Sequence, residues 1–548
     1  KWGARVGEGA VAMPDAAKKY VLAIDLGTGG PKVALVTTRG EIIGHETEDL
    51  SITFTPDGGA EQDARGWWDS IARASRRILE RTKVAREDVI AASVTTQWSL
   101  TVAVDQNGEP LMNAICWMDT RGAKYCKALK DGFIKIANCE VTRLWRWLRL
   151  TGGCPTDSGF DSLAHVLYIK NERPDVYRAT HKFLEPMDYI NLRLTGKFTA
   201  CYGGVFSMWI TDARDVARLK YDDGLLKIAG LDRDKFADLT PPLTVIGNLT
   251  PASAADLGLH TGVQVIVATG DNHSATVGSG AVKDYEGHCY VGTTSWLSSH
   301  VPFKKMDIFH LITTMPAAIP GKNIVLAQQG TGGECFRFLK ENILFRDDAC
   351  ATAPAPEDAY ERMNELAKTV PPGCDGLIFT PFLTGAMTPA DDHHTRSAFI
   401  NQSLKTTRAH YVRAVMEGVS FNLRWLLPYV EKFMARRFDA LNYIGGGAQS
   451  GTWCQIMADV LDRPIRQIDD PRQANVRGAA LLASLALGHI SFDEIAATVP
   501  VKNTYTPNPD NRALYDALAR EFVDFYSRNR AMYKRLNRTL YAGKGSKP

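Results

Sequence analysis

The chain has 548 residues, of which 45% are hydrophobic and 23% charged, and its formal net charge is +3. Because this length exceeds what one hydrophobic core supports, we expect at least two large domains. The near balance of charges argues against a nucleic-acid or membrane surface, and no run approaches the roughly eighteen apolar residues of a membrane span. The ten cysteines show no C-x-x-C pair, which favours free thiols in a reducing cytoplasm.

The first part of the chain mixes strand-like and helical patterns, which is typical of an α/β protein. Residues 1–19 lack the apolar core of a secretory signal, so we interpret them as a flexible arm, with Met13 a candidate original start. Strand-like runs lie at 20–26, 32–37, 89–95 and 101–104. Residues 66–83 predict a helix whose inner face holds Trp67, Ile71, Ile78 and Leu79.

The middle of the chain, roughly 120–250, is richer in helices and aromatic residues. Residues 163–177 predict a helix that Pro174 stops. A second strand set opens with a buried strand over 263–272. The stretch 287–301 then reads strand, turn, strand, which predicts that the layout of the first hairpin is repeated half a chain later.

The last third continues the α/β pattern. Residues 408–430 predict a helix, and 441–465 read strand, glycine turn, helix, strand. We expect a final amphipathic helix over 511–538, docked on the rest of the domain. Its apolar side is predicted to hold Leu514, Leu518, Phe522, Phe525 and Tyr526.

The first hairpin carries an acid where its first strand runs into a glycine turn, in the sequence D-L-G-T-G-G that begins at Asp25. Glycine lets backbone N–H groups approach phosphate oxygens closely. A carboxylate beside phosphate would repel it unless a divalent cation lies between them, and Mg²⁺ suits that place. The alternative is an ordinary hairpin with a capping aspartate.

Three further turns follow apolar strands in the same way. V-A-T-G-D-N places Asp271 at the mouth of a strand, where it could accept the proton of an attacking hydroxyl or simply cap the next helix. V-G-T-T-S-W and I-G-G-G-A-Q-S-G-T-W are suited to polyphosphate and adenosine, with ordinary tight turns as the alternatives. Neither a G-x-G-x-x-G dinucleotide fingerprint nor a Walker A lysine motif is present.

Taken together, these turns resemble the FGGY carbohydrate kinase family over nearly all of residues 20–540. The resemblance rests on DLGTGGPK, AEQDARGWWDSI, AICWMDTRGA, EPMDYINLRLTGKF, TGDN, VGTTSW, YVRAVMEGVSFNLR, IGGGAQSGTWCQIMADVLDRPI and VRGAALLASLALG. It implies two actin-like (ribonuclease H-like) ATPase domains with a catalytic cleft between them. We expect a sugar-binding domain over 20–283 that carries the catalytic base, and an ATP-binding domain over 284–548.

The resemblance also implies roles for individual residues. Asp271 matches the catalytic base and a metal-site acid, and Asp25 matches the acid that holds Mg²⁺ through water. The matched nucleotide and phosphate positions are Gly27, Thr28, Gly29, Lys32, Gly292, Thr293, Thr294, Gly446, Gly447, Ala448, Gln449 and Asn475. The matched sugar positions are Gln97, Trp98, Ser99, Trp117, Asp119, Phe160, Asp271, Asn272 and Trp296.

The sugar side departs from the better-known subfamilies. Where xylulokinases have Gln-Met-His-Gly and glycerol kinases Gln-Arg-Glu, this chain has Q-W-S-L. The missing Arg-Glu pair argues against glycerol, and Ser99 at the histidine position puts xylulose in question without excluding it. Xylulokinases also carry an arginine in G-x-x-T-P, which here reads G-A-M-T-P. We interpret His393 and His394, which follow, as solvated loop residues.

The leading interpretation is therefore an ATP- and Mg²⁺-dependent kinase that converts D-xylulose to D-xylulose 5-phosphate in the cytoplasm. Ribulose, another ketose or a polyol are alternatives within the same class. A pseudokinase that binds sugar or nucleotide without turnover is a second class, and the presence of both Asp25 and Asp271 argues against it. An actin- or chaperone-type ATPase ranks last. The resemblance further suggests a homodimer.

Overall fold

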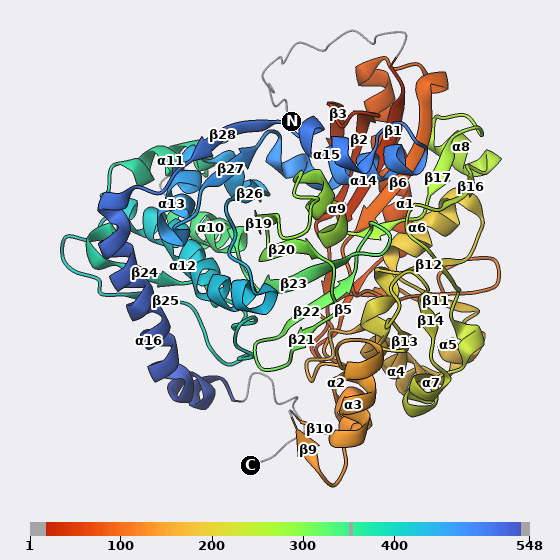
Figure 1. The fold of residues 1–548 in the computed structure, drawn as a ribbon, viewed down its shortest axis with the longest axis horizontal. Coiled ribbons are helices and arrows are strands. Elements are labelled where there is room, and N and C mark those ends of the chain that lie inside the picture. Colours follow the sequence, from red (N-terminus) through yellow and green to blue (C-terminus); the bar gives the residue numbers. More distant parts are fainter. Residues whose placement is uncertain (1–17, 137, 350–353, 539–548) are drawn as a thin grey trace. The chain divides into compact units, whose positions relative to one another are not determined.

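The computed structural model describes residues 18–136, 138–349 and 354–538. The chain divides into two compact units (Figure 1). The first unit comprises the described residues up to Gly280 together with Met315–Asn323 and Asn475–Thr498. The second unit comprises Ala281–Thr314, Ile324–Ala474 and the described residues from Val499 onward. Two later segments of the chain, 315–323 and 475–498, thus belong to the first unit.

The first unit is built on a mixed sheet in which β1 pairs antiparallel with β2 and parallel with β6. The strand order is β16-β17-β6-β1-β2-β3, and β18 also pairs with β6. The predicted strands at 20–26, 32–37 and 89–95 are confirmed. The strands are β1 (Tyr20–Gly27), β2 (Gly30–Thr37), β3 (Ile42–Thr47), β6 (Val89–Thr96), β16 (Val245–Asn248), β17 (Gln264–Ile266) and β18 (Thr269–Gly270).

Both faces of this sheet are covered by helices. Alternate residues of β1 point to opposite faces, so Leu22 and Ile24 pack with Trp67 of α1 (Ala64–Thr82). Val21 and Ala23 pack instead with Ala479 and its neighbours in α14 (Ala474–Ala486). A helix from late in the sequence therefore completes the core of the first unit.

Smaller elements complete the first unit, and two of them differ from expectation. One helix over 163–177 was predicted to stop at Pro174, but α4 ends at Glu172 and Pro174 begins α5, since proline suits the first helical position. The single strand predicted over 263–272 is two short strands, β17 and β18. The helices are α2 (Ala123–Lys130), α3 (Val141–Leu150), α4 (Ser162–Glu172), α5 (Pro174–Ala179), α6 (Pro186–Thr195), α7 (Asp223–Ala229), α8 (Pro251–Leu257), α9 (Asp271–Gly278) and α15 (Phe492–Thr498). The short strands are β4 (Thr53–Phe54), β5 (Ala60–Gln62), β7 (Val102–Val104), β8 (Ala114–Ile115), β9 (Lys135–Ile136), β10 (Cys139–Glu140), β11 (Lys182–Leu184), β12 (Thr199–Cys201), β13 (Thr211–Asp212), β14 (Lys220–Tyr221) and β15 (Asp238–Thr240).

The second unit repeats the plan of the first. Its sheet has the order β21-β22-β23-β20-β19-β26-β27-β28, in which β19 pairs antiparallel with β20 and parallel with β26. This is the relation of β1 to β2 and β6, so the predicted repeat of the first hairpin is confirmed. The strands are β19 (Gly287–Val291), β20 (Ser295–Val301), β21 (Met306–Asp307), β22 (Ile312–Pro316), β23 (Asn323–Gln329), β26 (Leu441–Ile444), β27 (Ile465–Ile468) and β28 (Val501–Tyr505), with β24 (Ile378–Thr380) and β25 (Ala398–Ile400) apart from this sheet.

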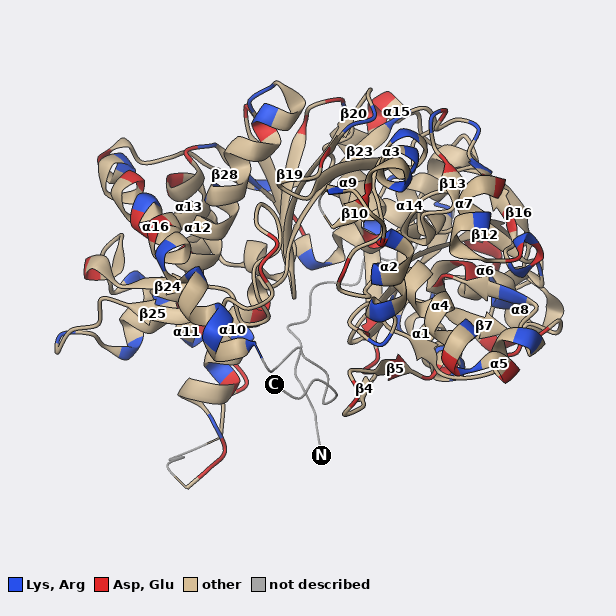
Figure 2. Ribbon diagram, turned by 90° about the horizontal axis from the view of Figure 1, so that it is seen from below, with Lys and Arg blue, Asp and Glu red and all other residues tan. Residues whose placement is uncertain are grey.

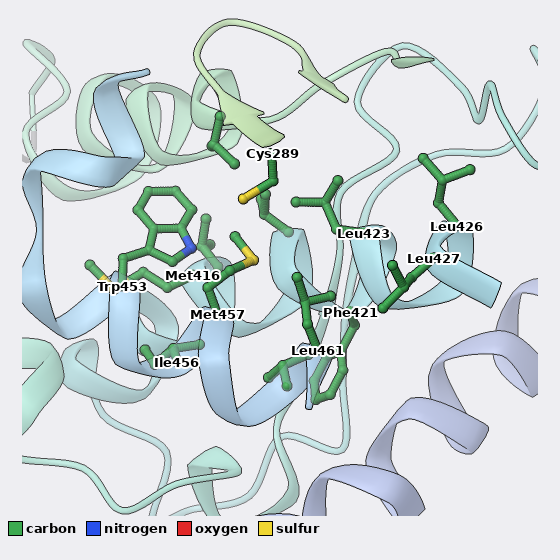
Figure 3. Close-up of a cluster of buried hydrophobic side chains, with 14 of the residues drawn as sticks. Cys289, Met416, Phe421, Leu423, Leu426, Leu427, Trp453, Ile456, Met457 and Leu461 are labelled. Atoms are coloured by element: carbon green, nitrogen blue, oxygen red, sulfur yellow. The ribbon is translucent and has the colours of Figure 1, made fainter. Parts of the chain in front are cut away.

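The core of the second unit lies around α12 (Arg408–Met434) and α13 (Gly451–Leu461), with Met416, Phe421 and Trp453 packed near Cys289 (Figure 3). The helix α16 (Arg512–Asn537) docks on this core as predicted, and Phe522 and Tyr526 of the predicted face are buried there. Its buried residues are Tyr515, Phe522, Tyr526 and Tyr533, while Leu514 is 40% exposed. The other helices are α10 (Gly333–Leu339) and α11 (Ala359–Lys368).

Charged residues are distributed over the surface without segregation by sign. Figure 2 shows lysine and arginine interspersed with aspartate and glutamate on the helices of each unit. Within the described ranges, no helix is long and apolar enough to cross a membrane.

Candidate active site

Two acids lie at the same edge of the first unit's sheet. Asp25 pairs in register with Thr95 of β6, and on the other side of β6 Gly270 of β18 pairs with Thr96. Asp271 follows Gly270 directly and opens α9. Because β1, β6 and β18 run parallel, their carboxyl ends meet at one edge, which is where ligands of α/β sheets bind. The structure therefore brings Asp25 and Asp271 together.

The two acids at this edge have different hydrogen-bond and ion-pair partners. Asp25 is 2% exposed, and Lys32 Nζ lies 3.1 Å from its Oδ2. Asp271 Oδ1 accepts the N–H of Asn272 at 2.7 Å. Burial, followed by repulsion from Asp25, raises the pKa of Asp271 to about 7. A carboxyl group with this pKa can take up a proton from a hydroxyl near neutral pH.

Thr28 belongs to a closed set of hydrogen bonds beside these acids. Its Oγ1 donates to Gln97 Oε1 at 2.8 Å, Gln97 Nε2 donates to Gln62 Oε1 at 3.0 Å, and Gln62 Nε2 returns to the Thr28 carbonyl at 2.9 Å. Trp117 Nε1 donates to Thr28 Oγ1 at 3.4 Å. Gln62 was not singled out in the sequence, although it lies within the A-E-Q-D motif. These hydrogen bonds hold the glycine turn at Thr28 against Gln97, one of the predicted sugar-binding residues.

The predicted aromatic residues of the first unit also lie together. Trp98 Nε1 donates to the Gly204 carbonyl at 3.3 Å, and its ring stacks on Phe206. The rings of Trp117 and Phe160 meet edge to face at 6.4 Å. These contacts give apolar walls of the kind that sugar sites use.

Two polar residues predicted to contact sugar have side chains that are hydrogen-bonded to other groups of the protein. Ser99, with a φ of 63°, donates its hydroxyl to the Phe160 carbonyl at 2.6 Å. Asp119 is 1% exposed and accepts from the Ala60 N–H at 3.0 Å and from Arg121 Nη2 at 2.7 Å. Their sugar contacts stay predictions, and these bonds support an orienting role. Sequence reasoning missed Arg121, which stands in the same W-M-D-T-R stretch.

The turn of the second unit that was predicted to bind phosphate joins β19 to β20. Gly333 N–H donates to the Gly292 carbonyl, and Gly332 N–H donates to the Thr293 carbonyl at 2.9 Å. A Cβ on Gly332 would lie 2.5 Å from the Thr294 carbonyl oxygen, so only glycine fits there. The T-G-G stretch that supports this turn was not predicted.

Trp296 was predicted to close over the substrate, and the structure places it inside the second unit. The side chain is 2% exposed, its Nε1 donates to His288 Nε2 at 2.9 Å, and its ring stacks on Tyr290 at 3.7 Å. This is the environment of a core tryptophan. The predicted sugar contact gains no support from these contacts.

The turn predicted to contact adenosine, called the adenosine turn below, follows β26. Gly445 has a φ of 90°, and Gly446–Gln449 form a short helical turn in which a Cβ on Gly446 would meet nothing within 4 Å. The turn thus offers open backbone to a ligand. Asn475, also predicted to contact nucleotide, is buried at the start of the segment of α14 that belongs to the first unit. Its nucleotide contact stays a prediction.

The two histidines that follow the G-A-M-T-P stretch lie between β24 and β25. Both are partly buried, and His393 Nε2 is 3.1 Å from Asp391 Oδ1. The hydrogen bond that His393 donates to this acid raises the pKa of His393. They are therefore less solvated than expected, because the loop packs beside its own acids.

Known proteins match this chain over most of its length. A xylulose kinase of Staphylococcus epidermidis is 28% identical over 528 residues, which are 94% of this chain and 97% of that protein. A gluconokinase of Bacillus subtilis is 24% identical over 508 residues, covering 92% and 95%. The crystal structure of a ligand-bound xylulose kinase from Lactobacillus acidophilus has a TM-score of 0.80 at 23% identity, covering 94% of this chain and all of that one.

The domain comparison agrees with these relatives. The N-terminal domain of the FGGY family of carbohydrate kinases matches residues 20–278, and its C-terminal domain matches residues 311–487. The fold is the two-domain actin-like ATPase fold of the solved sugar kinases, as the resemblance implied. The chain therefore belongs to the FGGY family of carbohydrate kinases.

Proposed function

We propose that this sugar kinase transfers a phosphoryl group from ATP to a hydroxyl of D-xylulose, giving D-xylulose 5-phosphate. The observation that carries the chemistry is Asp271, a carboxyl group with a pKa of about 7 at the sheet edge that also holds Asp25. Asp271 accepts the proton of the attacking hydroxyl, while Asn272 and the aromatic residues hold the sugar. Removing that proton makes the oxygen a better nucleophile.

The acids of the first unit also fit a magnesium ion. Asp25 is buried and acidic, and Lys32 is its one ion-pair partner among the described residues, so the edge has carboxylate oxygen to offer without a closed protein cage. Mg²⁺ is held by one or two carboxylates with waters and phosphate oxygens. Asp25, through water, and Asp271 would hold it, and the ion would neutralise charge on the phosphate oxygens.

The glycine turns are proposed as the nucleotide positions. Gly27–Gly29 with Lys32, and Gly292–Thr294, present N–H groups and hydroxyls that suit phosphate oxygens. Gly446–Gln449 leave flat backbone free for adenosine. These assignments follow the family motifs residue by residue.

The choice of D-xylulose is supported by the xylulose kinases among the relatives, although a gluconokinase also matches over most of its length. The segment Gln97–Leu100 differs from the xylulokinase sequence at the position where a histidine is usual. Gluconate, ribulose and other ketoses are therefore the competing substrates. Arg121, beside the predicted sugar residues, is already paired with Asp119 and Glu61, which favours a neutral sugar over a carboxylated one.

The substrate is tested by ADP release from the purified protein with Mg-ATP against D-xylulose, D-ribulose, other ketoses, gluconate, aldoses, polyols and glycerol. Turnover with D-xylulose at a kcat/KM at least about tenfold above the others supports the assignment. Preference for gluconate or another sugar would change the assigned substrate and leave the assignment as a sugar kinase unchanged. No ADP release with any sugar, together with retained nucleotide binding, would favour the pseudokinase.

A further inference from the structure

Glu185 is a buried acid that no step of the proposed reaction uses. It is 3% exposed and stands between β11 and α6, at the N-cap of that helix. Asparagine, aspartate, serine and threonine at such positions usually bond the first N–H groups of the helix. The Glu185 side chain makes no such bond. Its carboxyl group turns instead toward three other segments of the first unit.

Each of the three segments supplies one hydrogen bond to this carboxyl group. The N–H of Leu100 donates to Oε2 at 3.1 Å, and the hydroxyl of Ser207 donates to Oε1 at 3.1 Å. The hydroxyl of Ser162 also donates to Oε1. Ser162 and Ser207 are in turn 2.8 Å apart. One side chain thus joins points that are distant in the sequence.

These three segments carry Trp98 and Phe160, which are proposed to face the sugar, and Phe206, which stacks on Trp98. Leu100 ends the segment that holds Trp98, and Ser162 lies two residues after Phe160. Ser207 follows Phe206, on which Trp98 stacks. Two further hydrogen bonds link these segments directly. Ser99 Oγ donates to the Phe160 carbonyl, and Trp98 Nε1 donates to the Gly204 carbonyl. Glu185 is therefore hydrogen-bonded to the segments that carry Trp98, Phe160 and Phe206.

Core packing alone does not explain an acid at this place. A leucine or methionine would fill the space without the cost of burying a polar group, and buried carboxyl groups persist where their hydrogen bonds are needed. Among the described residues, Glu185 has these hydrogen bonds and no ion pair. Burial raises its pKa to about 8, so the neutral acid predominates at pH 7. A glutamine has nearly the same shape and is also neutral.

We propose that Glu185 is a positioning residue that holds the segments of Trp98, Phe160 and Phe206 in the arrangement that binds the sugar. The inference rests on the proposed sugar-kinase function. If Glu185 has this role, its carboxyl group positions the aromatic residues and does not contact the substrate. Loss of its bonds would weaken sugar binding, because displacements of about 1 Å in a binding wall are enough to reduce activity strongly. ATP binding would be unchanged.

The test compares Glu185→Ala and Glu185→Gln with the natural protein on its best sugar. We expect Glu185→Ala to raise the KM for sugar at least about tenfold with the KM for ATP unchanged, and Glu185→Gln to restore the sugar KM to within about threefold. Asp188→Asn is the matched control, since Asp188 is also buried in this region but, among the described residues, bonds to Cys201 and not to Leu100, Ser162 or Ser207. It should leave the sugar KM unchanged.

Several outcomes would overturn the inference while leaving the kinase intact. An unchanged sugar KM in Glu185→Ala is one, and an equal loss in Glu185→Ala and Glu185→Gln is another. If Glu185→Ala does not fold, Ser207→Ala carries the test: a rise in sugar KM alone supports the inference, and an unchanged value overturns it. If the natural protein phosphorylates no sugar, the proposed function fails and the inference fails with it.

Discussion

At the scale of single residues, the chemistry depends on how burial changes one carboxyl group. Asp25 and Asp271 share one sheet edge, yet only Asp25 has a lysine partner within 3.1 Å. The acid without that partner is the one whose pKa rises to about 7. A buried carboxyl group whose pKa is raised beside a second acid is typical of acid–base sites.

The first prediction concerns Asp271→Ala. Removing the base should reduce kcat by about 10²–10⁴-fold, because general base catalysis contributes that much. Sugar and ATP should still bind, since the walls and the glycine turns are unchanged. Calorimetric titration with each ligand and a coupled ADP assay measure the two effects. Activity within tenfold of the natural protein would remove Asp271 from the role of base.

The second prediction concerns pH. Asp271 must be ionised to accept a proton, and burial with repulsion from Asp25 raises its pKa to about 7. The value of kcat/KM for sugar should therefore fall about tenfold per pH unit below pH 7 and level off above it. A pH profile of the natural protein, with the coupling enzymes in excess, measures this limb. A flat profile from pH 5 to 8 would contradict the assignment.

At the scale of elements, the glycine turns depend on side chains from neighbouring strands. Gln467 of β27 donates from Nε2 to the Ala448 carbonyl at 2.7 Å and so fixes the adenosine turn. Its Oε1 accepts from Asn503 Nδ2 at 3.1 Å and from the Tyr505 hydroxyl at 3.3 Å. The edge strand β28 thus orients the amide that holds the turn.

The third prediction follows from this chain of bonds. Gln467→Ala should raise the KM for ATP about 2–12-fold, as expected for one neutral hydrogen bond, and leave the KM for sugar unchanged. The pattern is the reverse of that expected for Glu185→Ala, so the two variants control for each other. Steady-state kinetics with each substrate varied separately measures both. A rise confined to the sugar KM would show that the turn does not bind nucleotide.

Sequence patterns predicted those elements whose signal is local. The strands around Asp25 and the turn after β26 combine apolar runs with glycine, and both are where expected. The missed features depend on residues far apart in the chain. Glu185 meets Leu100, and Arg121 meets Glu61, through contacts that no spacing reveals. The predicted face of α16 is confirmed at Phe522 and Tyr526, whereas Leu514 is exposed and Tyr515 and Tyr533 fill positions that the pattern did not single out.

At the scale of the whole molecule, the first unit is assembled from distant parts of the chain. Helix α14 packs on the sheet of β1, and it passes so close to α9 that a Cβ on Gly478 would lie 1.9 Å from the Ser274 carbonyl oxygen. Helix α9 begins with Asp271. The position of Asp271, the proposed base, therefore depends on a residue some two hundred positions later.

The fourth prediction tests that contact. Gly478→Ala should destabilise the protein by about 1–3 kcal/mol through overpacking, and it should lower kcat by moving α9. Gly66→Ala is the control, because Gly66 lies in α1 and the nearest atom to its Cβ would be the end of the Asp63 side chain, at 3.3 Å. That change should be neutral or stabilising. Thermal unfolding and kcat of both variants decide the matter, and equal behaviour would contradict the prediction.

The return of α14 to the first unit also has a consequence for biosynthesis. Val21, Ala23, Ala34 and Val36 lack their apolar cover until Val476 and Ala483 have been translated. The first unit cannot complete its core while the ribosome is still making the second, although N-terminal domains commonly fold first. We expect nascent chains truncated near residue 290 to be protease-sensitive and to bind chaperones, and chains released beyond residue 498 to become resistant.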